Sequence, residues 1–377
     1  MRFSRSLSNI FLFFGAGLVS LVFVEISLRA LSIHHPAFYI VDAQRGYGLR
    51  PNARGIYSRE GHSIVAINSA GFRGSLPSRS PADGVFRIAV LGDSFTEALQ
   101  VNENETWVKV LQKQLNSLND CSLLEGRKAE ILNFGVGGYG TGQSLLTWRY
   151  LASKFRPDLV ILAVYPGNDF SDNEPIARDD RPYFKFSVDG NLEQDNSFKL
   201  SSSYRFRTSI FGLLLDNLIN HSRTLQLLNE SKNRFAALRR ESFTFRSSST
   251  SSPPSPPLPA SSEAWNLTEA LINKLYQEVN VTGARFLVVS TTSPDQVWPI
   301  ASERSSSVFL QEKRLANLLT SSQISYLSLG PLLQHAVDEA SAIFYLHGFS
   351  DNSGHGHWNS DGHNVAARQI APWLCQQ

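Results

Sequence analysis

A serine follows a short apolar run in the stretch FRIAVLGDSFTEAL, and the residues around it suit a nucleophile. Residues 86–91 have the length and composition of a buried strand, Gly92-Asp93-Ser94 follows directly, and a helical pattern opens at Thr96. A serine at such a corner lies beside backbone N–H groups that the first helical turn leaves unpaired. Those groups can hold the oxyanion that forms when a hydroxyl attacks an ester. The triplet alone is more typical of an ordinary helix N-cap than of a nucleophile.

Two further loops strengthen the nucleophile interpretation of Ser94. After the next two apolar runs come NFGVGGYGTG (133–142) and YPGND (165–169), again small and polar where strand periodicity stops. In open parallel sheets, ligands bind at the carboxyl ends of the strands. We therefore expect an oxyanion hole made by the Ser94 N–H, the Gly138 N–H and the Asn168 side-chain amide.

The second loop also contains a G-x-G-x-x-G pattern, which is typical of dinucleotide-binding turns. Such a site needs an acidic residue at the end of the next strand to bind the ribose. The candidate, Asp158, stands at the start of its strand and so at the opposite edge of the sheet. We reject this interpretation and expect no cofactor.

A serine nucleophile needs an imidazole base, and the C-terminal tail DNSGHGHWNSDGHNVAA offers three histidines. His357 lies in the loop before a predicted last helix, at the edge of the sheet where the other loops gather. His363 falls in the opening turn of that helix and is expected to pack or cap, and His355 has no assigned role. The spacing of the three matches no familiar metal-ligand pattern, so no metal site is expected.

The elements that must position these residues follow a regular rhythm. Helix-period segments alternate with strand-length apolar runs at 86–91, 129–134, 158–164, 284–290 and 324–328. Nearly unbroken apolar strands alternating with helices predict a parallel sheet covered on both faces, an α/β fold.

Other segments precede and interrupt this alternation of strands and helices. We expect an irregular lead-in at 29–84 and an insertion at 176–262, which could act as a lid over the site. Within the insertion, Asp189-Gly190 predicts a hairpin turn, 211–228 reads as helical, and 247–262 is a Ser/Pro-rich linker.

The N-terminus and the overall charge bear on location. Arg2 and Arg5 precede an uncharged run from Ile10 to Val24, and the apolar span lengthens to Leu7–Leu28. That length suffices to cross a bilayer. We favour an uncleaved signal anchor, with residues 1–28 forming the cytoplasmic tip and membrane helix, over a cleaved signal peptide, because no A-x-A-like site follows. The charge bias places the body outside the cytoplasm, in a periplasmic or cell-surface location.

Composition and cysteine usage narrow the function further. The 377 residues carry a net charge of +2, and aromatic residues do not interleave with basic ones, so no nucleic-acid partner is expected. The only two cysteines, Cys121 and Cys375, could pair in an exported chain or remain two buried thiols.

Taken in order, the motifs resemble those of the SGNH/GDSL hydrolases, over roughly 86–175 and 263–377. The family's letters fall on Ser94, Gly138, Asn168 and His357. The segment AINSAGFRG before the serine motif also looks like that of membrane-anchored, extracytoplasmic members. The resemblance implies a three-layer α/β/α sandwich with a five-stranded, flavodoxin-like sheet, formed by 85–175 and 263–377, and metal-free ester hydrolysis by a Ser–His pair.

The sequence departs from that family at the acid of the triad. The family sets an Asp three or two residues before the histidine, where this chain has Gly354 and His355. Asp351 is the nearest upstream candidate, and it could reach the imidazole if the loop bulges. Otherwise a Ser–His dyad would rely on a backbone carbonyl to orient the ring.

The leading hypothesis is therefore a membrane-anchored serine esterase acting on small acyl esters, with O-acetyl groups of a glycan as one candidate substrate and carbohydrate or lipid esters as the class. One rival is an O-acyltransferase that passes the same acyl group to a polysaccharide. A second rival is a non-catalytic binding or assembly protein on a hydrolase scaffold, which the missing Asp would favour.

Overall fold

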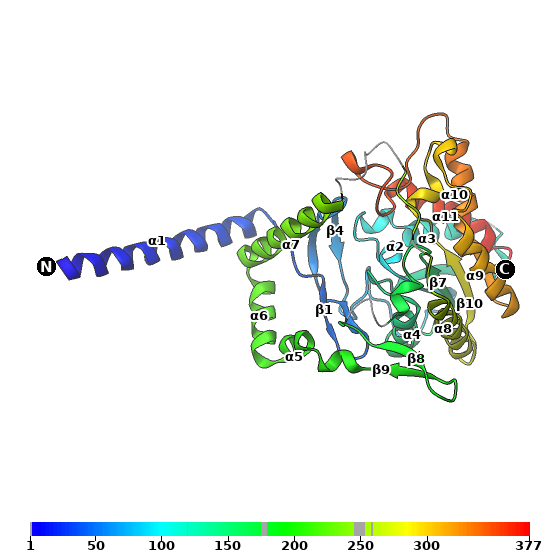
Figure 1. The fold of residues 1–377 in the computed structure, drawn as a ribbon, viewed down its shortest axis with the longest axis horizontal. Coiled ribbons are helices and arrows are strands. Elements are labelled where there is room, and N and C mark those ends of the chain that lie inside the picture. Colours follow the sequence, from blue (N-terminus) through cyan, green and yellow to red (C-terminus); the bar gives the residue numbers. More distant parts are fainter. Residues whose placement is uncertain (1, 119, 175–178, 245–252, 258) are drawn as a thin grey trace.

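A five-stranded parallel sheet forms the centre of the protein (Figure 1). The computed structural model describes residues 2–118, 120–174, 179–244, 253–257 and 259–377. The strand order is β11-β10-β7-β5-β6, and every neighbouring pair is parallel. The strands are β5 (Val85–Leu91), β6 (Lys128–Asn133), β7 (Leu159–Val164), β10 (Arg285–Ser290) and β11 (Ser325–Ser328). The five strands expected from the sequence are confirmed, and their order is the flavodoxin-like one.

Helices cover both faces of the sheet, because successive strand residues point to opposite sides. Ile88 and Val90 belong to one apolar core, with α3 (Trp107–Ser117), α10 (Leu329–Asp338) and α11 (Ser360–Leu374). Ala89 and Leu91 belong to the other, with α4 (Thr141–Tyr150), α8 (Ser262–Asn280) and α9 (Leu310–Ser321). The predicted three-layer α/β/α sandwich is thus present.

A disulfide joins the loop after α3 to the end of α11. Cys121 and Cys375 are 254 residues apart in sequence, and their Cα atoms lie 4.6 Å apart. Of the two alternatives that the sequence leaves open, the structure has the paired one.

The lead-in differs from the irregular segment expected at 29–84, because it contains two short hairpins. Strand β1 (Tyr39–Asp42) pairs with β2 (Gly46–Leu49), and β3 (Arg54–Tyr57) pairs with β4 (Ser63–Ala66). A small apolar core that includes Leu49, Val65 and Tyr139 fixes them against the loop after β6. Strands of four residues are too short to leave a period that a sequence pattern can reveal.

The described part of the insertion contains the predicted hairpin and three helices. Strands β8 (Tyr183–Phe186) and β9 (Leu192–Asp195) pair across a turn that holds Gly190 at φ +78°. The helical stretch expected at 211–228 is divided between α6 (Ile210–His221) and α7 (Arg223–Thr244), which follow α5 (Ser202–Thr208). Ser222 separates α6 from α7 in an extended conformation, and its hydroxyl accepts from the Leu225 N–H (3.2 Å). Residues 176–178, 245–252 and 258 of the predicted insertion and linker lie outside the described residues.

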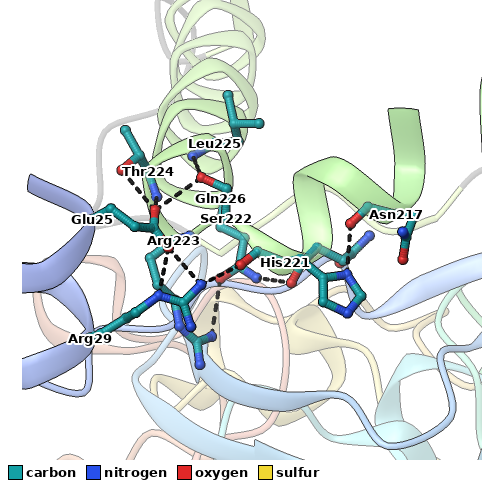
Figure 2. A network of polar contacts seen from close by, with 10 residues as sticks. Glu25, Arg29, Asn217, His221, Ser222, Arg223, Thr224, Leu225 and Gln226 are labelled. Atoms are coloured by element: carbon teal, nitrogen blue, oxygen red, sulfur yellow. Dashed lines mark hydrogen bonds and ion pairs between the residues drawn. The ribbon is translucent and has the colours of Figure 1, made fainter. Parts of the chain in front are cut away.

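Helix α1 (Arg2–Ala30) projects from the body (Figure 1). Its residues Phe11–Ala30 are long and apolar enough to cross a membrane, a property that a signal sequence shares. The end of α1 is bonded to the insertion (Figure 2): Glu25 accepts from the backbone N–H groups of Arg223 (3.0 Å) and Thr224 (2.9 Å), at the start of α7. Arg29 pairs with Glu25 (2.7 Å) and donates to the His221 carbonyl (2.6 Å).

Candidate active site

Ser94 begins a helix of only four residues, α2 (Ser94–Glu97), directly after β5. Asp93 caps this helix, since its Oδ1 accepts from the Phe95 N–H (2.9 Å). The helix ends where Ala98 adopts a left-handed φ of 55°. The buried Arg73 of the lead-in donates to the carbonyls of Glu97 (3.0 Å) and Ala98, and so fixes this turn from outside the sheet.

The structure brings the Ser94 hydroxyl and the His357 imidazole together at the carboxyl edge of the sheet. The distance from Ser94 Oγ to His357 Nε2 is 2.8 Å. His357 reaches this position from the loop before α11, 263 residues further along the chain. At this distance the imidazole can take the proton of the hydroxyl directly.

The other ring nitrogen of His357 is held by Glu60, which is not among the site residues expected from the sequence motifs. Glu60 lies in the turn between β3 and β4, and its Oε2 is 2.5 Å from His357 Nδ1. Its Oε1 accepts from the His357 backbone N–H (2.7 Å). Gly356 has φ +72°, and a Cβ at that position would collide with Glu60 Oε1, so only glycine fits beside the acid.

Glu60 therefore occupies the position expected for Asp351. Asp351 lies in a 3-10 turn at Ser350–Asn352, where it is exposed, and the Nδ1 atom it was expected to contact already has Glu60 as its partner. The expectation depended on closeness in sequence, whereas the acid that reaches the ring is 297 residues away. Because Glu60 is the partner of Nδ1, it also takes the place of the backbone carbonyl that was the alternative for orienting the ring.

The pair His357–Glu60 shifts the pKa values of both groups in opposite directions. Burial by itself lowers the pKa of His357, but the hydrogen bond and charge of Glu60 outweigh it, so the net shift is upward from 6.5. Burial by itself raises the pKa of Glu60, and His357 reverses that shift to a net lowering from 4.5. Each group thus favours the charged form of the other.

The expected oxyanion donors line the same cavity as Ser94 and His357, which has a volume of about 850 Å³. Gly138 has φ +74°, a conformation that favours glycine, in the loop after β6. Asn168 donates from Nδ2 to Asp172 Oδ2 (2.6 Å). Because an amide nitrogen carries two hydrogens, Asp172 can orient Asn168 while the second hydrogen remains for a bound oxygen.

The rest of the cavity wall comes from the lead-in, from the loops at the edge of the sheet and from the insertion. Aromatic side chains form much of it, and the insertion contributes a basic residue and a proline-rich segment. The lining residues include Tyr39, Tyr57, Tyr165, Arg207, Pro254 and Pro257. The lead-in and the insertion, which both lie outside the sandwich, thus contribute to the wall.

Carboxyl groups of Glu97, Asp180 and Asp295 also line this cavity. Glu97 is buried, accepts from the Tyr39 hydroxyl (2.8 Å) and lines the cavity near Gly137. Burial raises the pKa of Glu97 to about 7. A group of this kind can accept or donate a hydrogen bond to a bound hydroxyl at neutral pH.

The other histidines of the tail lie away from the serine hydroxyl. His363 is buried in the core and its Nδ1 accepts from the Trp107 N–H (3.3 Å), so it packs. His355 is near the Trp298 ring, with 5.8 Å between the ring centroids. Within the described ranges, no three His, Cys, Asp or Glu side chains are grouped so that they could hold a metal ion.

Among known proteins, this chain matches solved structures only. No protein-family model and no curated protein matches the chain. Solved structures that resemble it include the acetyl xylan esterase AlAXEase, at 11% identity and a TM-score of 0.40, covering 76% of this chain and 98% of that one. A catalytic mutant of Axe2, an acetylxylan esterase from Geobacillus stearothermophilus, matches at 9% identity and a TM-score of 0.40, covering 76% and 93%.

A lipolytic protein of the G-D-S-L family from Desulfitobacterium hafniense DCB-2 is similar at 10% identity and a TM-score of 0.37, covering 76% of this chain and 98% of that one.

Proposed function

We propose that this protein is a serine esterase of the SGNH/GDSL type, anchored in a membrane with its catalytic body outside the cytoplasm. One observation carries the proposal: Ser94 Oγ, the His357 imidazole and the Glu60 carboxylate form a continuous hydrogen-bonded line, at 2.8 and 2.5 Å, that opens into a cavity of about 850 Å³. Serine, base and orienting acid in this order are the arrangement that activates a hydroxyl for acyl transfer.

The mechanism follows from the positions of these atoms. Ser94 Oγ attacks the ester carbonyl while its proton moves to His357 Nε2, and Glu60 stabilises the imidazolium through Nδ1. The Ser94 and Gly138 N–H groups and the Asn168 amide hold the oxyanion. Collapse of the intermediate expels the alcohol, which takes the proton from Nε2. Water then attacks the acyl carbon while one of its protons moves to Nε2, and the second intermediate collapses to the free acid as Ser94 Oγ takes that proton back.

Two features support a location outside the cytoplasm. The disulfide between Cys121 and Cys375 is typical of an oxidising compartment. Arg2 and Arg5 before the apolar helix favour a cytoplasmic N-terminus.

A third feature supports an anchor that is retained. Glu25 of α1 caps α7 by accepting from the Arg223 and Thr224 N–H groups (Figure 2). Cleavage after α1 would remove this acceptor from the start of α7, which would leave those N–H groups without their partner.

The cavity suits a small acyl group on a hydroxyl-rich alcohol, such as an O-acetylated glycan. Tyr39, Tyr57 and Tyr165 offer aromatic faces and hydroxyls, and Glu97 offers a carboxyl of near-neutral pKa. Acyl esters of carbohydrates are therefore the substrate class that we propose.

Transfer of the acyl group to a sugar hydroxyl is the second candidate, and one observation favours it. Pro254 and Pro257 of the insertion line the same cavity as Ser94, and an apolar wall of this kind would reduce the access of water. Counting a labelled acetyl group that leaves the enzyme as acetate against one that appears on an added oligosaccharide separates the two reactions.

Fluorophosphonate labelling of the full-length protein tests the catalytic proposal. We expect stoichiometric labelling of the wild type and none of Ser94→Ala. Labelling of neither form, with both folded by circular dichroism, would support the non-catalytic scaffold instead.

A further inference from the structure

Helix α6 presents apolar side chains to the outside of the protein. Ile210, Leu214 and Leu218 are spaced four residues apart and so form one row along the helix, and Phe211 lies beside them. These four side chains are between 57% and 81% exposed. A contiguous apolar face of this kind on a soluble surface marks a site of interaction.

Polar contacts fix the opposite side of α6 to the body. Asp216 pairs with Arg50 of the lead-in through two bonds of 2.7 and 2.9 Å. Asn220 Oδ1 accepts from the Ala37 N–H (3.2 Å). The polar side of α6 therefore faces the protein, and its apolar side faces outward. The helix cannot turn the apolar row inward without breaking the Arg50–Asp216 ion pair.

The position of α6 relative to α1 points to what covers the row. Arg29, near the end of α1, donates to the carbonyl of His221, the last residue of α6 (Figure 2). Figure 1 shows α6 at the edge of the body from which α1 projects, lying across the direction of α1. A bilayer crossed by α1 would have its surface at this edge.

We propose that the outer face of α6 is embedded in the boundary between headgroups and acyl chains of the bilayer that α1 crosses. This inference rests on the proposed membrane anchor. An interfacial helix of this type lies in the membrane plane with its apolar face inward and basic residues at the headgroups. The exposed Arg205 and Arg207 of α5 supply that positive charge immediately before the row.

Docking of α6 would place the active site next to the lipid surface. Arg207 lines the active-site cavity, and it also lines an apolar cavity of about 370 Å³ between β1, α5 and α6. The wall of the catalytic cavity is thus continuous with the lipid-facing elements. A substrate held at the membrane surface would reach Ser94 without leaving it.

A fluorescent probe on Leu214→Cys in the full-length protein tests the proposal. Both native cysteines are in the disulfide, so the introduced thiol is labelled uniquely. The labelled protein is reconstituted in phosphatidylcholine and phosphatidylglycerol vesicles, and quenching by doxyl-labelled lipid is compared with quenching by aqueous iodide. We expect at least threefold stronger quenching by the lipid quencher and protection from iodide.

Two control positions make failure informative. A probe on Leu18→Cys in α1 reports the anchor, and one on Val188→Cys, in the exposed turn between β8 and β9, reports a position in water. If Leu18→Cys is quenched by lipid while Leu214→Cys behaves like Val188→Cys, the anchor stands and the docking of α6 is overturned. If Leu18→Cys is not quenched either, the anchor itself fails and the docking with it.

A second copy of the chain is the other occupant that the test recognises. In that case the probe on Leu214→Cys would be protected from iodide and also insensitive to the lipid quencher, which overturns the proposal. A paired substitution completes the test: with Leu214→Glu and Leu218→Glu, a probe on Phe211→Cys should become at least threefold more accessible to iodide. Hydrolysis of soluble p-nitrophenyl acetate should stay unchanged.

Discussion

The carboxyl edge of the sheet and the lead-in hairpin both supply catalytic groups, but they are constructed differently. At the edge, Ser94 lies at the turn between β5 and α2. Residues of both elements belong to the same apolar core. The hairpin holds Glu60 on a turn between two four-residue strands, and it packs against the loops at the edge. The nucleophile and the base therefore belong to the sandwich, and the orienting acid belongs to a segment outside it.

The difference separates what each region contributes to the reaction. Ser94 and His357 exchange the proton, so their loss removes the chemistry. Glu60 contacts His357, at the imidazole and at the backbone N–H, and takes no part in the proton exchange, so its loss leaves a slower reaction. Substitutions in the two regions should consequently fall into distinct classes of effect.

The largest effect is expected at the base. His357→Ala should lower kcat for p-nitrophenyl acetate by about 10⁶, since removal of the base in a triad costs as much as removal of the whole triad. His355→Ala is the matched control from the same loop and should retain most activity. Equal losses at both positions would refute the assignment of the base.

Glu60→Gln should lower kcat by roughly 10²–10⁴, because a triad without its acid holds the imidazole in the wrong tautomer. Asp351→Asn is the matched control, since Asp351 is exposed in the loop that holds His357, and it should be close to wild type. Steady-state kinetics of both variants decide which region supplies the acid. A loss at Asp351→Asn alone would return that role to the histidine loop.

Asn168→Ala should lower kcat by about 10²–10³ with little change in KM, because an oxyanion donor acts mainly in the transition state. Asp172→Asn should give a smaller loss of the same kind, since Asp172 only orients the Asn168 amide. A change confined to KM would show that Asn168 binds the ground state instead.

The pH profile refines the comparison. The neutral imidazole is the active form, so kcat/KM should rise with pH through a midpoint above 6.5, where Glu60 holds the pKa of His357. Glu60→Gln removes the group that favours the imidazolium, and the midpoint should move to lower pH. A midpoint that does not move would mean that Glu60 does not interact with the ring in solution.

The same pair has a signature in stability. Because the folded-state pKa of His357 is raised, its contribution to stability is fully present below 6.5 and is lost as pH rises through the folded value. Because the pKa of Glu60 is lowered, its contribution is present above 4.5 and is lost as pH falls through the folded value. The melting temperature of the wild type should exceed that of Glu60→Gln by the largest margin between pH 4.5 and pH 6.5.

The smallest effect on catalysis is expected from the disulfide. Replacing Cys121 and Cys375 by serine should lower the free energy of unfolding by about 2–5 kcal/mol and leave kcat at 25 °C nearly unchanged. Denaturant unfolding and p-nitrophenyl acetate hydrolysis, measured on the same preparation, check both parts. A large loss of kcat would show that the C-terminal helix depends on the bond to place His357.

The sandwich and its edge could be predicted because their signals are local. Apolar strand runs such as 158–164 and loops such as Gly92–Ser94 carry the pattern within a few residues. Glu60 could not be predicted in this way, since its role depends on a contact 297 residues away. The available signals were indirect: the missing Asp before His357, and only three acidic residues, Asp42, Glu60 and Asp83, in the whole lead-in.

The bond between Cys121 and Cys375 closes a covalent ring around most of the chain, with Ser94 outside the ring and His357 within it. A single backbone cut between Cys121 and His357, for instance in the Ser/Pro-rich linker, would leave one fragment with the nucleophile and another with the base. The two fragments would remain tethered and would separate on a gel only after reduction, so that a nicked enzyme keeps its catalytic partners at each other's side.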